Sequence, residues 1–188
     1  TQFGGVLAGT APGNAAWYDG SYYYVNNNTR ELRKATPSGP STFVDTLVKQ
    51  FSSNLSGFGD ITFNTTSTNP GDGTLYMSSG QGLLRYKLGD ANFTTISPGT
   101  PAMQLGFAQD NQLYGIESST STAFVEKVYR INLSTGARTE VSTFSNGASV
   151  YIRDAATAPT PPVPEPASMA VLGLGLAALR RRRNAKKN

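Results

Sequence analysis

The sequence predicts an all-β domain built from repeated units, followed by an extended linker and a short apolar segment at the C-terminus. The composition is the first sign, because nine Tyr, nine Phe and 20 Gly among 188 residues, with only 15% charged residues, favour strands and turns over helices. The second sign is a strand-and-turn pattern that recurs three times within residues 1–154. The third is an abrupt change at Ala155, where prolines replace the strand-forming residues.

The repeat is clearest at a tight turn followed by an aromatic strand. It reads Asp-Gly-Ser-Tyr-Tyr-Tyr at 19–24, Asp-Gly-Thr-Leu-Tyr at 72–76 and Asp-Asn-Gln-Leu-Tyr at 110–114. Asp-Gly and Asp-Asn supply the positive-φ positions that a two-residue hairpin turn requires. We expect Leu75, Tyr76, Leu113 and Tyr114 to lie on equivalent inner strands and to pack into the core.

Three further strands complete each repeat. One candidate strand precedes the turn, at 15–18, 60–63 and 104–107. Two follow it, the first at 32–35, 84–88 and 129–133 and the second at 43–47, 93–96 and 138–141. The repeats therefore span about residues 14–50, 58–98 and 102–143, which is the size of one β-propeller blade.

This order of strands resembles the blades of bacterial propellers of the NHL and YVTN kind. The resemblance implies a small or partial β-propeller over residues 1–154, in which neighbouring blades cover one another. Residues 3–7 and 149–153 are candidates for a fourth blade that joins the two chain ends. A β-sandwich with the same strands and an N-terminally truncated propeller remain as alternatives.

Cysteine and histidine are both absent, and this limits the possible chemistry. Without Cys there is no disulfide or thiolate nucleophile, and without His the usual general base and most transition-metal sites are lost. No two of the 12 acidic residues can be linked as a catalytic pair by sequence reasoning. We therefore expect a non-enzymatic protein with no cofactor and no metal.

The net charge of +4 arises from the end of the chain. Residues before Arg180 carry 10 basic and 12 acidic side chains. The other basic residues are Arg180, Arg181, Arg182, Arg183, Lys186 and Lys187. A nucleic-acid-binding protein would carry its positive charge on the folded domain, so nucleic acid is not expected as a partner.

Asp and Arg recur once in each repeat. Asp19, Asp72 and Asp110 are candidate calcium ligands, but Asp also initiates turns, and we favour that reading.

Arg33, Arg85 and Arg130 are candidates for binding anionic sugars or for packing and hydrogen bonding at the sheet edges, and we favour packing.

Aromatic residues are dense in the first repeat, at Trp17, Tyr18, Tyr22, Tyr23 and Tyr24. Exposed rings stack on sugar faces, so these residues could form a polysaccharide platform. Strand alternation places some of them in the core instead, and we favour core packing.

Residues 155–162 form a Pro-rich linker, in which a polyproline II conformation is favoured. An uncharged run follows at 167–179 and ends at four arginines, Arg180, Arg181, Arg182 and Arg183. An apolar helix enters the bilayer and a basic cluster stops on its cytoplasmic side, so the arginines would act as a stop-transfer signal. Thirteen residues span only about 20 Å as a helix, against a hydrocarbon core of about 30 Å, which suits transient better than permanent anchorage.

The C-terminal segment, residues 163–188, resembles the PEP-CTERM sorting signal. The motif is Val163, Pro164, Glu165 and Pro166, followed by the apolar run and the arginine cluster. The alternatives are an ordinary tail anchor with a chance Pro-Glu-Pro and a basic amphipathic helix on the membrane surface.

The resemblance implies a substrate of an exosortase, an integral-membrane processing enzyme. It further implies an exported protein of a Gram-negative bacterium that resides transiently in the inner membrane and then at the cell surface or in the extracellular matrix. We expect a structural or interaction role there, or alternatively a polysaccharide-binding module of the exopolysaccharide matrix. The first residue, Thr1, indicates either a removed signal peptide or a fragment.

Overall fold

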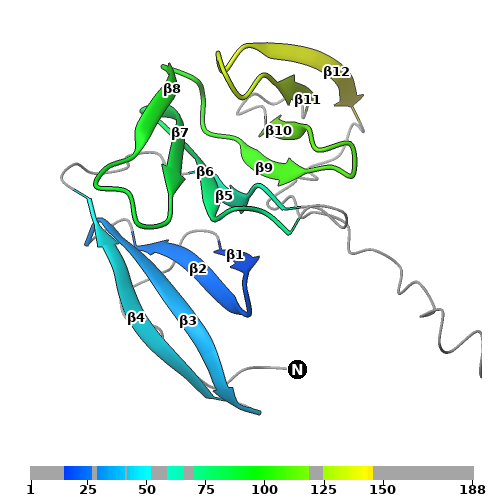
Figure 1. Cartoon of the computed structure of the whole chain (residues 1–188). Helices are drawn as coiled ribbons and strands as arrows, with labels where there is room; N and C mark the ends of the chain where they lie inside the picture. The colour runs from blue at the N-terminus through cyan, green and yellow to red at the C-terminus, as the bar shows by residue number, and fades with distance from the viewer. Residues whose placement is uncertain are drawn as a thin grey trace, which may run out of the picture. The chain divides into compact units, whose positions relative to one another are not determined.

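The computed structural model describes residues 15–26, 29–40, 42–51, 59–65, 70–118 and 125–145. These residues form twelve β-strands in three four-stranded antiparallel sheets, here called sheets I, II and III (Figure 1). Within each sheet the strands lie side by side in chain order. The prediction of an all-β body with four strands per repeat is thereby confirmed.

Each sheet is a short meander of consecutive strands. Sheet I contains β1 (Ala15–Tyr18), β2 (Ser21–Asn26), β3 (Glu31–Gly39) and β4 (Thr42–Gln50). Sheet II contains β5 (Asp60–Phe63), β6 (Thr74–Ser79), β7 (Gly82–Lys87) and β8 (Thr94–Pro98). Sheet III contains β9 (Gln104–Phe107), β10 (Leu113–Ser118), β11 (Val125–Ile131) and β12 (Arg138–Ser145).

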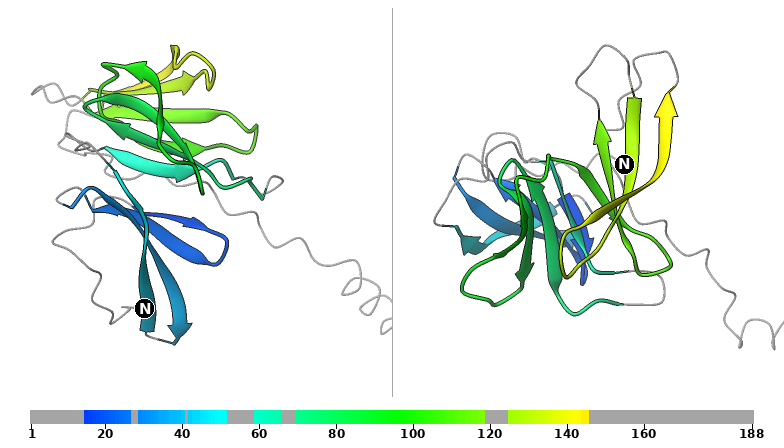
Figure 2. Two further views of the ribbon diagram at one scale, coloured as in Figure 1. Left: turned by 60° about the vertical axis from the view of Figure 1, so that its left-hand side comes forward. Right: turned by 90° about the horizontal axis from the view of Figure 1, so that it is seen from above.

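The sheets are arranged as successive blades. Their first strands are neighbours, because β5 contacts both β1 and β9, and the later strands of each sheet lie progressively farther from this junction (Figures 1 and 2). This is the arrangement of a partial β-propeller. The alternative of a two-layer β-sandwich is wrong, since the same strands form three sheets.

The expectation of equivalent inner strands needs a correction. Leu75, Tyr76, Leu113 and Tyr114 do lie on equivalent strands, but these are the second strands, β6 and β10. The innermost strands are β1, β5 and β9. Leu75, Tyr76 and Leu113 are buried, whereas Tyr114 is partly exposed.

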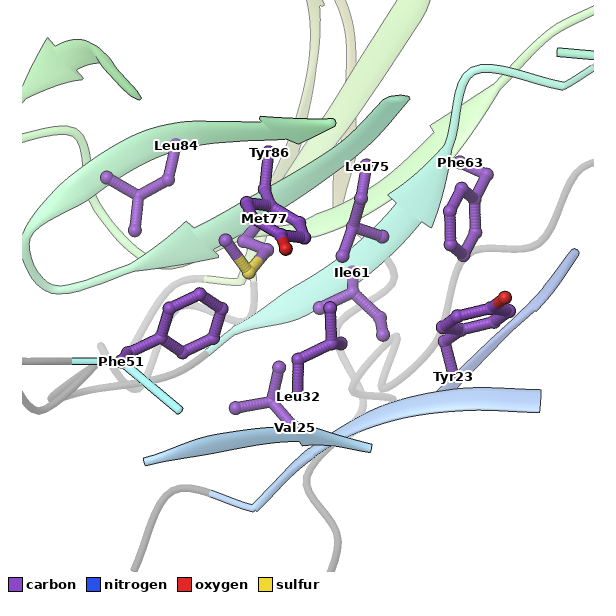
Figure 3. Packing of buried hydrophobic residues seen from close by; sticks show 10 residues of the cluster. All are labelled: Tyr23, Val25, Leu32, Phe51, Ile61, Phe63, Leu75, Met77, Leu84 and Tyr86. Atoms are coloured by element: carbon purple, nitrogen blue, oxygen red, sulfur yellow. The ribbon is translucent and has the colours of Figure 1, made fainter. Parts of the chain in front are cut away.

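The apolar core between sheets I and II is formed by facing side chains from both (Figure 3). Sheet I contributes Tyr23, Val25 and Leu32, and Phe51 follows directly after β4. Sheet II contributes Ile61, Phe63, Leu75, Met77, Leu84 and Tyr86. Tyr23 and Phe63 meet edge to face with ring centroids 4.9 Å apart. Aromatic and branched side chains thus fill the space between the two sheets.

A second core lies between sheets II and III. Its buried members are Tyr76, Leu83, Met103, Leu105, Phe107, Leu113 and Ile131. Tyr76 and Leu83 alternate along their strands with residues of the first core, as expected for side chains on opposite faces of one sheet. Sheet II is therefore covered on both faces, and every residue of β5 and β6 is buried.

Polar side chains complete the joint between sheets II and III. Asp60 accepts a hydrogen bond from the backbone N–H of Ile61 through Oδ1 (2.7 Å) and one from that of Leu105 through Oδ2 (2.8 Å). Ser78 Oγ accepts the backbone N–H of Met103 at 2.6 Å. Both side chains are only 1% exposed, so these bonds satisfy backbone donors in the interior.

Several predicted segments lie outside the described residues. They are the fourth-blade segments 3–7 and 149–153, the Pro-rich linker 155–162 and the C-terminal segment 163–188. Among the residues that the structure describes, no helix is long and apolar enough to traverse a bilayer.

The second core provides a test of the fold. Leu113 is completely buried between sheets II and III, so Leu113→Ala removes apolar contacts and leaves a cavity. We expect the free energy of unfolding to fall by about 2–5 kcal/mol in urea denaturation. Val141→Ala is the matched control, because Val141 is 50% exposed and its truncation should change stability by less than about 0.5 kcal/mol. Equal effects of the two substitutions would contradict this account of the core.

Candidate functional site

One face of sheet I carries exposed aromatic side chains. Tyr23, Val25 and Leu32 point toward sheet II, so the alternating residues point to the opposite side. We call that side the outer face of sheet I. The strand registers place Trp17, Tyr22, Tyr24, Arg33, Ala35, Phe43, Asp45 and Leu47 on it.

Three aromatic rings cross this outer face from β1 to β4. Trp17 lies directly opposite Tyr22 in the register, and their rings meet edge to face at 4.6 Å between centroids. Tyr22 in turn meets Phe43 at 6.2 Å, also edge to face. Trp17 is 51% exposed and Tyr22 is 37% exposed, so this group of rings reaches the surface.

A charged cluster lies beside the rings. Arg33 Nε donates to both carboxylate oxygens of Asp45, at 3.2 and 3.1 Å, and Arg33 Nη1 forms an ion pair with Glu31 Oε2 at 3.1 Å. The Tyr24 hydroxyl donates to Asp45 Oδ2 at 2.9 Å. Arg33 is therefore held by two carboxylates, which supports packing and hydrogen bonding rather than sugar binding as its role.

Burial, followed by the hydrogen bond to Asp45 and the charge of Asp45, raises the pKa of Tyr24 to about 12. Arg33 opposes this effect with its own hydrogen bond and positive charge. The phenol of Tyr24 thus stays protonated and remains a donor at neutral pH. These contacts form a network of hydrogen bonds and ion pairs on the outer face of sheet I.

The register corrects the expected equivalence of the three arginines. Arg85 lies opposite Tyr76 and Arg130 lies opposite Tyr114. In sheet I the corresponding tyrosine is Tyr23, and its partner is Lys34 rather than Arg33. The Lys34 ammonium lies 5.7 Å from the centroid of the Tyr23 ring. A basic residue therefore faces a tyrosine in each sheet, and Arg33 belongs to the opposite face.

The three aspartates lie at equivalent positions before the second strand of each sheet, but only Asp19-Gly20 forms the expected two-residue hairpin turn. Ten residues separate β5 from β6, and five separate β9 from β10. Asp19 and Gly20 both have positive φ, 45° and 73°, as a type I′ hairpin turn requires. Asp72 Oδ1 accepts the N–H of Thr74 at 3.1 Å, and Asp110 Oδ1 accepts that of Gln112 at 3.0 Å. The preferred reading of these aspartates as turn residues agrees with this geometry. Among the described ranges, no three acidic residues come together in a way that could hold a metal ion.

The aromatic residues of the first repeat divide between the core and the surface. Tyr23 and Tyr24 are buried, and Tyr18 stacks on Phe63 at 4.4 Å between centroids. Trp17 and Tyr22 remain as the exposed pair. Sequence reasoning did not identify Asp45 or Asp60 as important, although a lone carboxylate within an apolar strand, as in Asp-Ile-Thr-Phe at 60–63, was an available signal.

The predicted sorting residues Val163, Pro164, Glu165 and Pro166 and the stop-transfer residues Arg180, Arg181, Arg182 and Arg183 lie outside the described residues. The profile of the PEP-CTERM protein-sorting motif matches residues 162–183, which include all eight. The chain thus carries a PEP-CTERM motif in the segment where the sequence predicts it. A comparison with curated proteins finds no match.

Two solved structures are similar to the body at low sequence identity. One is a functionally unknown protein from Desulfotomaculum acetoxidans DSM 771, with 19% identity, a TM-score of 0.43, and coverage of 71% of this chain and 41% of the other. The second is Saccharomyces cerevisiae Sqt1, with 12% identity, a TM-score of 0.39, and coverage of 76% and 36%. The chain thus spans well under half the length of these two proteins.

The Tyr24–Asp45 hydrogen bond predicts a particular pH dependence. At pH 7, Tyr24→Phe should lower the free energy of unfolding by about 1–3 kcal/mol, because Asp45 loses a donor. The folded pKa is raised, so the contribution of Tyr24 is complete below the unfolded pKa of about 10 and is lost as the pH approaches 12. The difference in the free energy of unfolding between the wild type and Tyr24→Phe, measured by urea denaturation, should therefore become smaller above pH 10. Val141→Ala removes no titrating group and serves as the control, and a constant Tyr24→Phe difference up to pH 11.5 would contradict the prediction.

Proposed function

We propose that this chain is a cell-surface or extracellular-matrix protein whose β body serves there as a non-enzymatic structural or interaction module. The PEP-CTERM motif at 162–183 is the observation that carries the proposal, since it implies export, sorting to the surface and processing by an exosortase. The host would be a Gram-negative bacterium, and the destination would be its exopolysaccharide matrix.

The physics of the C-terminal segment supports transient residence in the inner membrane. An apolar run of thirteen residues between a proline-rich segment and four arginines can enter the bilayer but is short for a permanent span. Arginine is costly at the bilayer centre, so the cluster stops transfer. The body then lies on the outer side of the membrane until the segment is removed.

The lack of an evident catalytic group supports the non-enzymatic part of the proposal. The sequence contains neither Cys nor His, so any proton transfer near neutral pH would depend on perturbed carboxyl groups or amines. Within the described residues, the buried carboxylate of Asp60 and the partly buried carboxylate of Asp45 have structural partners. Asp45 binds Arg33 and Tyr24, and Asp60 binds two backbone N–H groups. These contacts occupy the carboxylates in holding the fold.

Polysaccharide binding is the second candidate function. It is favoured by the exposed rings of Trp17 and Tyr22, because aromatic faces stack on the C–H surfaces of sugars. Glycan-array binding by the purified protein tests this role, with Trp17→Ala as the variant that should abolish the signal. Absence of binding to any host polysaccharide would leave the structural role as the proposal, whereas turnover of the polysaccharide would contradict a non-enzymatic role.

Processing at the C-terminus is the first prediction of the proposed function. Surface protein isolated from the host should lack residues 180–188, because the basic cluster would remain with the membrane-side fragment. Glu165→Gln should slow this processing, since Glu165 is the only charged side chain between Asp154 and Arg180 and is nearly isosteric with Gln. Intact-mass spectrometry measures the outcome, and Thr160→Ala in the linker is the control. The full basic tail on all surface protein would refute the prediction.

Membrane topology gives a second prediction. Each arginine costs about 2.5–3.5 kcal/mol at the bilayer centre, so changing Arg180, Arg181, Arg182 and Arg183 to Ser should remove the barrier to full transfer. Unprocessed protein should then appear in the medium, as measured by cell fractionation and immunoblotting. The corresponding four lysine substitutions keep the charge and should behave as the wild type. If the serine variant fractionates like the wild type, the arginines do not act as a stop-transfer signal.

A further inference from the structure

We propose that the outer face of sheet I binds the outer face of sheet III of a second copy of this chain, so that two copies close head to tail into one ring of blades. The outer face of sheet III is the side away from sheet II and contains Tyr114, Ile116, Val128, Arg130 and Phe144. The chain makes this kind of joint twice within itself, between sheets I and II and between sheets II and III. The proposal does not depend on the proposed function or on the C-terminal segment.

The strand registers show that Trp17 occupies an interface position. Trp17 pairs with Tyr22 between the first two strands of sheet I. The equivalent pairs in the other sheets are Phe63 with Leu75 in sheet II and Phe107 with Leu113 in sheet III. Phe63 and Phe107 are 2% and 1% exposed, because each packs against the preceding sheet. Trp17 has the same place in its sheet but is 51% exposed.

The other half of the joint is a tyrosine on the second strand. Tyr23 meets Phe63 at 4.9 Å between ring centroids, and Tyr76 meets Phe107 at 5.6 Å. These two tyrosines and Tyr114 are equivalent, because each lies opposite the basic residue of the third strand. Tyr114 is thus the third tyrosine of the series, and Trp17 is the aromatic residue that matches it.

The outer face of sheet III has the character of an interface. Tyr114, Ile116 and Val128 are partly exposed, and Phe144 is 52% exposed. A hollow of about 250 Å³ on sheet III is lined by Gln112, Arg130, Ile131, Asn132, Ala137 and Thr139, and Arg130 lies opposite Tyr114 in the register. On the outer face of sheet I, Tyr22 is 37% exposed beside Trp17, and Leu47 on β4 is 52% exposed. Apolar groups are therefore available on both faces for burial in a joint.

A second copy is the occupant that explains both faces together. A sugar could stack on Trp17 and Tyr22, but it would not account for Trp17 lying at the position where Phe63 and Phe107 join sheets. A head-to-tail contact forms a closed ring when its rotation closes, and two copies would contribute six sheets. Six lies within the roughly four to eight blades typical of propellers, whereas three copies would give nine.

Mass measurement and cross-linking of the full chain in a mild non-ionic detergent test the proposal. Sedimentation velocity should show a dimer. Trp17→Ala and Tyr114→Ala should each raise the dissociation constant by roughly tenfold or more, as expected for a central aromatic anchor. The double variant should be only slightly weaker than either single variant, because the two rings contact each other. Val44→Ala is the matched control, since Val44 is 52% exposed but its register places it on the side of β4 away from the outer face.

A photo-reactive benzoylphenylalanine at position 17 identifies the contact. In a mixture of isotopically labelled and unlabelled chains, the cross-link should join the two isotopic forms and map to the peptide that contains Tyr114. A monomeric wild type, a cross-link confined to one chain, or a dimer unaffected by both alanine substitutions would overturn the proposal. The last result would place the association elsewhere, for example in the apolar C-terminal segment. The proposal would also be overturned if Trp17→Ala abolished glycan binding while the dimer stayed intact. The outer face of sheet I would then bind sugar rather than a second copy.

Discussion

The burial of sheet II on both faces is the constraint on which the rest of the body depends. A single four-stranded sheet exposes two faces, and only a neighbouring sheet can cover each of them. Leu75 and Met77 face sheet I, while Tyr76 and Leu83 face sheet III. Because adjacent residues of β6 belong to different cores, the strand tolerates few polar substitutions. Its six residues are accordingly all buried, including the serines that end it.

The two joints of sheet II differ in what holds them. Aromatic packing is prominent in the joint with sheet I, where the ring of Phe63 contacts those of Tyr18 and Tyr23. In the joint with sheet III the buried side chains of Asp60 and Ser78 also bind backbone N–H groups of Leu105 and Met103. A buried donor without a partner costs about 1–3 kcal/mol, so these side chains determine where the chain enters β9. Polar groups thus fix the position of sheet III, and apolar burial supplies much of the driving force.

The sequence predicts the number and order of strands well, because turn chemistry and alternation are local properties. Asp19-Gly20 forms the type I′ turn that its residues favour, and the aromatic strand that follows is divided between core and surface. The register of the third strands is harder to predict. Aligning the Leu-Arg pairs 32–33 and 84–85 places Arg33 beside Arg85, but cross-strand pairing makes Lys34 the equivalent residue. A shift of one residue in the pairing register moves every side chain of the strand to the opposite face of the sheet. Only the pairing with the neighbouring strand shows which register is formed.

The same registers show why equivalent positions in a repeat carry different residues. Phe63 and Phe107 fill a confined space between two sheets of one chain, where a phenyl ring fits at low exposure. At the equivalent place in sheet I, the larger indole of Trp17 packs on Tyr22 and remains half exposed. On the same face, Arg33, Asp45 and Tyr24 bind one another through an ion pair and hydrogen bonds. In the equivalent places of sheet II the register puts the apolar residues Leu84 and Met77 opposite each other, and both lie in the core.

An outer face therefore needs polar groups that are satisfied within the sheet, together with a few large rings at its surface, because it must be stable before any partner binds. The outer face of sheet I has both features, and this separates it physically from the inner faces that share its strand pattern.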